Sequence, residues 1–226
     1  MIHSILVLAA TAAVTFAQNN TGAIMKQVIL KQNPQYTLNY NIINETSANP
    51  TLNVTLIIQG YDTSKWTSAD GKTGFYLGLG FGRSEMKNVD AINCLYFWTN
   101  KTTDVFQCYD MWFDGNRQPV STPEAQDAKN VRTTGVKVPA GEFTVSYQRA
   151  FKTGDPANLD YVLSLNDTTD FIWSFGPIRV GQAQEHQDPD SGNIKLNILT
   201  GELISFAKYL QGAFIGSFVV ISALLI

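Results

Sequence analysis

The chain has 226 residues, of which 44% are hydrophobic and 15% charged, and its formal net charge at pH 7 is −3. This length and composition are sufficient for one domain with a core of ordinary size. Acidic residues slightly outnumber basic ones, 19 against 16. The chain therefore lacks the excess positive charge of nucleic-acid-binding proteins, and we expect no nucleic-acid partner.

The first 17 residues, MIHSILVLAATAAVTFA, form an apolar run that ends in small residues. An apolar middle followed by a small residue at the cleavage position is typical of a secretory signal peptide, although the charged start is weak here. A buried N-terminal helix is the alternative. We predict that residues 1–17 are removed and that residues 18–205 hold the folded domain with a C-terminal spacer.

The final segment is also apolar, and residues 212–226 (GAFIGSFVVISALLI) carry no charge. Extended back to Tyr209, the run reaches the length of a membrane-spanning helix, about 17–25 residues. Small residues upstream, at 191–192 and 200–201, also fit the processing site of a GPI anchor. We expect residues 206–226 to attach the domain to a membrane by one of these two routes. The domain would then lie at the cell surface or on a lumenal face.

Between these ends the chain consists of short β-rich segments separated by turn residues. In residues 51–59, for example, Leu52, Val54 and Leu56 alternate with polar neighbours, the pattern of a half-buried strand. The predicted strands are 28–31, 36–43, 51–59, 75–81, 92–98, 105–113, 131–138, 142–151, 161–165 and 171–175. About ten short strands, with no convincing amphipathic helix, predict an all-β antiparallel sandwich.

The two cysteines, Cys94 and Cys108, lie in aromatic-rich runs on either side of the polar turn 99–103. If the runs pair as a hairpin, the cysteines are directly opposite each other. Opposed residues of antiparallel strands have Cα atoms about 4.5–5.5 Å apart, which is within disulfide reach. A zinc site is disfavoured, because two cysteines and one distant histidine do not make a structural ligand set. We predict a disulfide.

Five Asn-x-Ser/Thr sequons are present. In a secreted chain each one indicates a surface position that can carry an N-linked glycan. The predicted acceptors are Asn19, Asn44, Asn53, Asn100 and Asn166.

Residues 74–90, GFYLGLGFGRSEMKNVD, combine a glycine-rich strand with a polar turn. Gly78, Gly80 and Gly82 fall on one face of the strand, because side chains alternate. Glycines there either leave a flat shelf for a ligand or permit a bulge or close packing within the sheet. A phosphate-binding loop is excluded, since no Lys-Ser pair and no strand-to-helix context follow.

The turn in this stretch presents Met86, and His186 is the only histidine apart from His3. Taken singly, a methionine is usually a gap-filler in a core, and a histidine in a polar loop is usually a surface residue. Together, a thioether and an imidazole are a known axial pair for haem iron. Such a pair leaves no open position for dioxygen, so the chemistry would be outer-sphere electron transfer.

Hydrolytic chemistry finds less support. A Ser–His–acid arrangement would need His186 as its base, and no serine has a nucleophile-elbow context. Paired carboxylates for glycosidic cleavage remain an alternative. The acidic residues near the glycine-rich strand are Glu85, Asp90, Asp110 and Asp114.

The order of these motifs resembles a known family. A YLGLGFG strand precedes Met86, FKTGD follows at 151–155, IWSFG at 172–176, and then His186. This order is similar to that of the DOMON domain, a module found beside dopamine β-monooxygenase and in the cytochrome domain of cellobiose dehydrogenase. The resemblance extends from about Lys31 to His186.

The resemblance implies an immunoglobulin-like β-sandwich with a ligand at one end. In haem-binding members a methionine after the glycine-rich strand and a histidine near the C-terminal end ligate b-type haem, and Met86 and His186 match these positions. Attachment would be non-covalent, because Cys-x-x-Cys-His is absent. We expect further pocket residues to be Gly78, Gly80, Tyr76, Phe81 and Trp173.

The chain carries no flavin dehydrogenase, copper monooxygenase or multi-helix membrane cytochrome, and so resembles stand-alone, membrane-anchored DOMON proteins. The leading hypothesis is a non-catalytic electron carrier that receives electrons from ascorbate or a membrane reductase. Other members of the family are thought to bind sugars, and a glycan-binding or adhesion module is the alternative. A third hypothesis is an accessory subunit of a membrane complex. Aromatic faces for a sugar are Trp66, Trp98, Trp112 and Tyr109.

Overall fold

The computed structural model describes residues 15–18, 24–66, 68–99, 106–113, 122–123, 129–133, 140–154, 159–184, 186 and 190–207. Within these ranges the regular elements are strands, fourteen in all, against about ten predicted. Among the same residues, none forms a helix long and apolar enough to cross a membrane. Most of the predicted signal peptide and residues 208–226 of the predicted tail lie outside the described residues.

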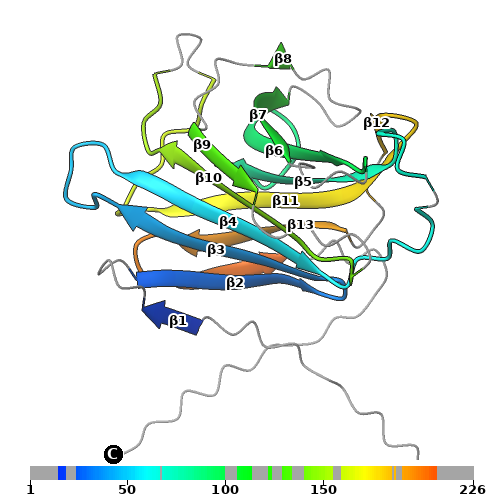
Figure 1. Ribbon diagram of the computed structural model, residues 1–226. Helices are drawn as coiled ribbons and strands as arrows, with labels where there is room; N and C mark the ends of the chain where they lie inside the picture. Colours follow the sequence, from blue (N-terminus) through cyan, green and yellow to red (C-terminus); the bar gives the residue numbers. More distant parts are fainter. Residues whose placement is uncertain are drawn as a thin grey trace, which may run out of the picture.

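The strands form two sheets in which every pair is antiparallel (Figure 1). The first sheet contains, in spatial order, β1 (Thr15–Gln18), β2 (Ile24–Gln32), β3 (Gln35–Ile43), β4 (Thr51–Gln59), β10 (Phe143–Ala150) and β9 (Lys129–Thr133). The second contains β14 (Leu203–Ala207), β13 (Ser191–Asn197), β11 (Thr168–Arg179), β5 (Gly74–Phe81), β6 (Val89–Phe97), β7 (Gln107–Phe113) and β8 (Thr122–Pro123). The short β12 (Gln182–Ala183) pairs with β11.

The sandwich core lies between the two sheets and follows from the alternation of apolar residues. In β4 every second side chain, including Leu52 and Leu56, is buried, whereas the residues between them are half-buried. Leu77 and Leu79 of β5 are buried in the same core. Tyr36 of β3 also belongs to it, and its ring makes an edge contact with that of Trp173, with the centroids 5.7 Å apart. The predicted all-β antiparallel sandwich is confirmed.

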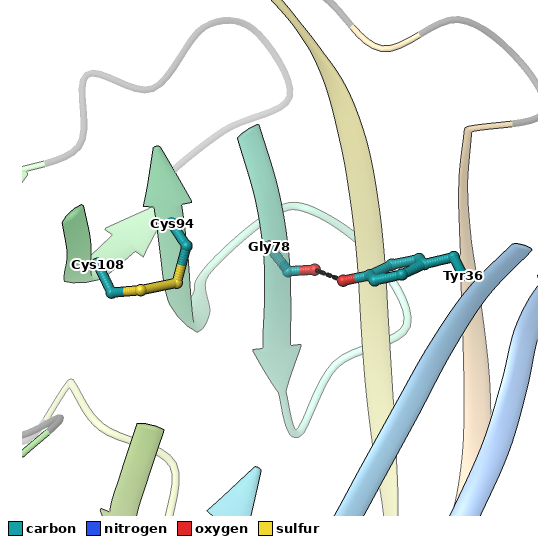
Figure 2. The surroundings of a disulfide bond; sticks show 4 residues. All are labelled: Tyr36, Gly78, Cys94 and Cys108. Carbon is teal, nitrogen blue, oxygen red and sulfur yellow. Dashed lines mark hydrogen bonds between the residues drawn. A yellow bond between two sulfur atoms is a disulfide. The ribbon is translucent and has the colours of Figure 1, made fainter. Parts of the chain in front are cut away.

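The predicted disulfide is also confirmed. Strands β6 and β7 pair with Cys94 directly opposite Cys108, and the two sulfurs are bonded. Figure 2 shows the bridge beside β5, where the hydroxyl of Tyr36 donates a hydrogen bond to the carbonyl oxygen of Gly78 at 3.4 Å. Because Tyr36 belongs to the first sheet and Gly78 to the second, this bond links the sheets at the glycine-rich strand.

One predicted strand is wrong. Residues 161–165 form no strand, because their backbone groups bond to partners outside a ladder. The amide of Tyr161 donates to the carboxylate of Asp90 at 2.8 Å, and the amide of Leu163 donates to the carbonyl of Phe151 at 3.0 Å. The segment is therefore a loop fastened to the end of β10 and to β6.

Five of the described strands, β1, β8, β12, β13 and β14, were not predicted, and the last two widen the second sheet. In β13 the buried Gly192, Ile194 and Leu196 alternate with polar residues, and the strand pairs with β11. Strand β14 pairs with β13 and extends to Ala207, two residues into the segment predicted as the tail. The second sheet is therefore wider than the sequence analysis indicated.

Candidate functional site

The second sheet has two faces, and the glycines of β5 lie on the face away from the sandwich core. Gly78 is paired with Asn93 on one side and Ser174 on the other, and Gly80 is paired with Ala91 and Ile172. This outer face carries a second group of apolar side chains, here called the outer cluster. Its members are Val89, Ala91, Met111 and Phe113, which are buried, and Met86, Tyr109 and Ile172, which are partly buried.

Only one of the three predicted shelf glycines leaves space for a ligand. A Cβ on Gly80 would lie 2.7 Å from Cγ1 of Ile172, so this glycine permits close packing. Gly82 has a positive φ of 75°, and a Cβ there would lie 2.1 Å from the ring of Tyr161. Gly78 is partly exposed, and a Cβ there would find its nearest neighbour at 3.5 Å. The packing alternative thus holds for Gly80 and Gly82, and the shelf is confined to Gly78.

Met86 lies in the loop between β5 and β6, and its partly buried side chain packs against the outer cluster. The loop is attached to neighbouring strands by two hydrogen bonds. The amide of Gly82 donates to the carbonyl of Asp170 at 2.7 Å, and Nδ2 of Asn193 donates to the carbonyl of Ser84 at 3.1 Å. The thioether is therefore held on the apolar outer face.

His186 follows β12 and is partly buried. Its Nδ1 is inaccessible to solvent and has no hydrogen-bond partner among the described residues. The segment around it is fastened to β11 before and after the histidine: the amide of Gln184 donates to the carbonyl of Pro177 at 2.9 Å, and the amide of Phe175 donates to the carbonyl of Asp190 at 3.0 Å. A buried ring nitrogen without a partner is unusual, because buried polar groups are normally satisfied.

The strand register places the remaining predicted pocket residues on different faces of the second sheet. Tyr76 lies on the outer face, where its ring covers Gly176: a Cβ on that glycine would lie 2.8 Å from the ring. Phe81 and Trp173 lie on the opposite face, in the sandwich core. Phe81 and Trp173 therefore do not share a face with Gly78, and a ligand on the outer face would not contact them.

The four aromatic residues considered for sugar binding also lie on different faces of the second sheet or in the sandwich core. Trp66 and Trp98 pack against the sandwich core, with their own ring centroids 5.9 Å apart. Trp112 is paired with Asp90, which faces the core. Tyr109 is the one of the four on the outer face, where it is partly exposed and paired with Asn93.

A cluster of charged residues that was not predicted from the sequence lies on the core side of the same strands. Arg149 and Asp90 are fully buried and form an ion pair. The Asp90 carboxylate also accepts the amide of Tyr161, whose carbonyl accepts Nη2 of Arg149 at 2.8 Å. Burial raises the pKa of Asp90 to about 6, although the guanidinium opposes this shift. Asp110 and Asp160 lie beside this pair.

Of the carboxylates considered for hydrolysis, Glu85 is exposed and Asp114 lies outside the described residues. Asp90 and Asp110 are buried on the core face, away from the partly exposed Gly78. A glycosidic pair open to a sugar chain is therefore not found among the described residues.

Comparison with known proteins identifies the fold and the family. Residues 59–176 match the family model described as the DOMON domain. Met86 lies within the matched range, and His186 lies ten residues beyond its end. Among curated protein sequences, none matches this chain significantly.

Two solved structures share the fold. The cytochrome domain of cellobiose dehydrogenase from Myriococcum thermophilum has a TM-score of 0.55 at 10% identity, covering 84% of this chain and 91% of that one. The cytochrome b domain of pyranose dehydrogenase from Coprinopsis cinerea has a TM-score of 0.51 at 11% identity, covering 84% and 90%. At these identities the similarity is one of fold.

Proposed function

Because this chain belongs to the DOMON domain family, we propose that it is an extracytoplasmic b-type cytochrome domain that relays single electrons. Met86 and His186 would hold the haem iron through the thioether sulfur and an imidazole nitrogen. One observation carries the proposal: Met86 is held, partly buried, against the outer cluster, so that its thioether lies in apolar surroundings on the same side of the sheet as the partly exposed Gly78. The fold shared with two cytochrome domains supports it.

The residues present fit a haem. A porphyrin is flat and largely apolar. The outer cluster offers it apolar contacts, and Gly78, on the same face of the sheet, leaves room that a side chain would otherwise take. The Nδ1 of His186 is buried and has no partner among the described residues, so the imidazole is not committed there to another described group. A methionine and a histidine are a donor set that haem iron accepts in electron-transfer proteins.

When bound, haem supplies a one-electron couple, and two protein ligands leave no position for dioxygen. The chain's own residues supply the rest. The outer cluster excludes water from the methionine side. The bonds Gly82–Asp170 and Asn193–Ser84 hold the Met86 loop, and the bonds at Pro177 and Phe175 hold the segment of His186.

Absorbance spectroscopy of protein expressed with ample haem tests the proposal. We expect a Soret band and a six-coordinate, low-spin spectrum. Met86→Leu removes the sulfur at nearly constant volume and should lower the reduction potential, and His186→Ala should lose the haem. The matched control is Met111→Leu, since Met111 belongs to the same cluster on a strand. Absence of haem from the wild type, or identical spectra for all variants, would refute the proposal.

The proposed location is the cell surface or a lumenal face, with removal of residues 1–17 and attachment through residues 206–226. The Cys94–Cys108 disulfide supports an oxidising compartment, where such bonds persist. Ascorbate or a membrane reductase is the proposed electron donor. Stopped-flow reduction of the haem protein by ascorbate tests the first of these donors. If ascorbate does not reduce the haem, the membrane reductase is the remaining proposed donor.

A glycan-binding role is supported by one observation, the partly exposed ring of Tyr109 on the outer face near Gly78. Aromatic faces commonly stack on sugar rings, and the shelf would admit one. Saturable glycan binding by haem-free protein, abolished in Tyr109→Ala, would favour this role over electron transfer.

A further inference from the structure

The loop that carries Met86 has a residue of positive φ at each end. It connects β5 to β6, and Phe81 is paired with Asp90 at its base. Gly82 has a φ of 75° and Asn88 a φ of 53°, which are left-handed conformations that glycine and asparagine tolerate best. Met86 lies midway between Gly82 and Asp90 in the sequence. In so short a loop, the position of Met86 depends on the geometry of the base.

The ring of Tyr161 lies directly against the first residue of this loop. A Cβ on Gly82 would lie 2.1 Å from Cδ2 of Tyr161 and 2.5 Å from its Cγ, so that the ring takes the space of a side chain. The backbone of Tyr161 is bonded on the other side of the loop, since its amide donates to the carboxylate of Asp90 at 2.8 Å. Tyr161, which is distant in sequence, therefore contacts the chain both before and after Met86.

Arg149, on the opposite sheet, holds the same base from the core side. Its guanidinium is paired with Asp90, lies 4.8 Å from the centroid of the Phe81 ring, and donates from Nη2 to the carbonyl of Tyr161 at 2.8 Å. Hydrogen bonds from a charged donor are stronger than neutral ones, and this side chain is fully buried. The base of the loop, the backbone of Tyr161 and the guanidinium therefore form one connected unit.

From these contacts we propose that Tyr161 is a positioning residue for Met86, and that Arg149 and Asp90 hold Tyr161 in place. The inference rests on the proposed function, since it concerns how the methionine ligand is held. Tyr161 acts through the loop backbone: its ring keeps Gly82 against β11, where the amide of Gly82 donates to the carbonyl of Asp170 at 2.7 Å. Without the ring the loop opens more often, and Met86 leaves the iron more often.

Hydrogen exchange of the full chain without haem tests the contact itself. Tyr161→Ala removes the ring and keeps both backbone bonds, and we expect faster exchange at the amide of Gly82 because local opening becomes easier. Tyr161→Phe keeps the ring and should restore the slow exchange. Tyr61→Ala is the matched control: Tyr61 is also a partly buried tyrosine outside the strands, but its ring packs against that of Phe75, with the centroids 4.6 Å apart. This control should leave the exchange of Gly82 unchanged.

Imidazole titration of the haem protein tests the consequence for Met86. Added imidazole competes for the position of Met86 on ferric iron, so its apparent affinity measures the fraction of molecules in which Met86 has left. We expect imidazole to bind Tyr161→Ala about tenfold more tightly than the wild type, as for a rise in that fraction from about 1% to about 10%. The reduction potential should also fall, because methionine ligation raises it. Tyr161→Phe should restore both values, and Tyr61→Ala should not change them.

A second variant alters the same contact from the loop. Gly82→Ala places a Cβ against the ring of Tyr161 and should give the same changes as Tyr161→Ala. The inference is overturned if Tyr161→Ala leaves both the exchange of Gly82 and the imidazole affinity unchanged, or if Tyr61→Ala changes them equally. A wild type that takes up no haem would refute the proposed function, and with it the positioning of an iron ligand. The exchange measurement would still show whether Tyr161 holds the loop.

Discussion

Gly78 and Gly80 lie two residues apart on the same face of β5, yet their surroundings differ. A Cβ on Gly80 would approach Ile172 to 2.7 Å and Val89 to 3.0 Å, whereas one on Gly78 would make ordinary contacts. Overpacking of this kind typically costs about 1–3 kcal/mol. We expect Gly80→Ala to lower the free energy of unfolding by that amount.

Gly78→Ala is the control for this prediction and should change stability by less than about 0.5 kcal/mol, as is usual for accessible positions away from packed features. Urea denaturation of both variants gives the two values. Equal losses in the free energy of unfolding would show that Gly78 is as crowded as Gly80, and that no space for a ligand exists at Gly78.

The described glycosylation acceptors also differ residue by residue. Asn44 and Asn166 are exposed in turns. Asn53 lies within β4, and its Nδ2, the atom to which a glycan is joined, donates to Oδ1 of Asn41 at 2.8 Å. In a secreted chain we expect occupancy at Asn44 and Asn166 and little at Asn53, because a glycan there displaces a hydrogen bond in the sheet. Mass spectrometry of peptides after enzymatic deglycosylation measures this. Full occupancy of Asn53 would contradict the prediction. Asn19 and Asn100 lie outside the described residues.

At the scale of elements, the disulfide closes the β6–β7 hairpin across a sequence separation of 14. A crosslink around a loop of about 15 residues stabilises by about 3 kcal/mol in the chain-entropy model. The double variant Cys94→Ala/Cys108→Ala should therefore unfold at lower urea concentration. Dithiothreitol should destabilise the wild type and leave the double variant unchanged. If the wild type does not respond to reductant, the bond contributes nothing to stability.

Strands with clear alternation were predictable, and those whose pairing is set by tertiary contacts were not. Residues 51–59 alternate cleanly and form β4 with the predicted bounds. Strand β13 alternates Ile194 and Leu196 with polar residues, but this pattern is short and was assigned to a spacer. Residues 161–165 were predicted as a strand because they are apolar, yet the carboxylate of Asp90 takes the amide of Tyr161. Local composition does not reveal that a side chain distant in sequence takes a backbone amide that a neighbouring strand would otherwise bond.

At the scale of the whole molecule, the Asp90–Arg149 pair joins β6 of one sheet to β10 of the other. Removal of one partner from a buried ion pair typically costs about 3–5 kcal/mol, because a buried charge is left without compensation. We expect Arg149→Met to destabilise by that amount. The double variant Arg149→Met/Asp90→Leu should recover part of the loss. Chemical denaturation of the three proteins measures the coupling, and purely additive losses would show that the pair does not act as a unit.

This cluster marks the limit of the sequence-based prediction of the site. Met86 and His186 were proposed as ligands from residue type and order, and that assignment stays a prediction. The pairing of Asp90 with Arg149 spans 59 residues and depends on which faces of β6 and β10 meet. Phe81 and Trp173 were assigned to a pocket from their aromatic character and their proximity in sequence, and strand alternation places them on the side of the sheet opposite Gly78. The family resemblance indicated the ligands and not the register.

Strand β11 lies between β5 and β13 at Phe171–Ser174, where its amides and carbonyls bond on both sides. The loop of Met86 and the segment of His186 are both fastened to this strand. Amides of such central strands exchange with solvent deuterium only through global unfolding, whereas edges open locally. The amides of β11 should therefore exchange last, and protection at Gly82 and Gln184 should exceed that of ordinary loop residues. If Met86 and His186 bind haem as proposed, their attachment to this slowly exchanging strand would keep the two ligands in one geometry through each oxidation and reduction.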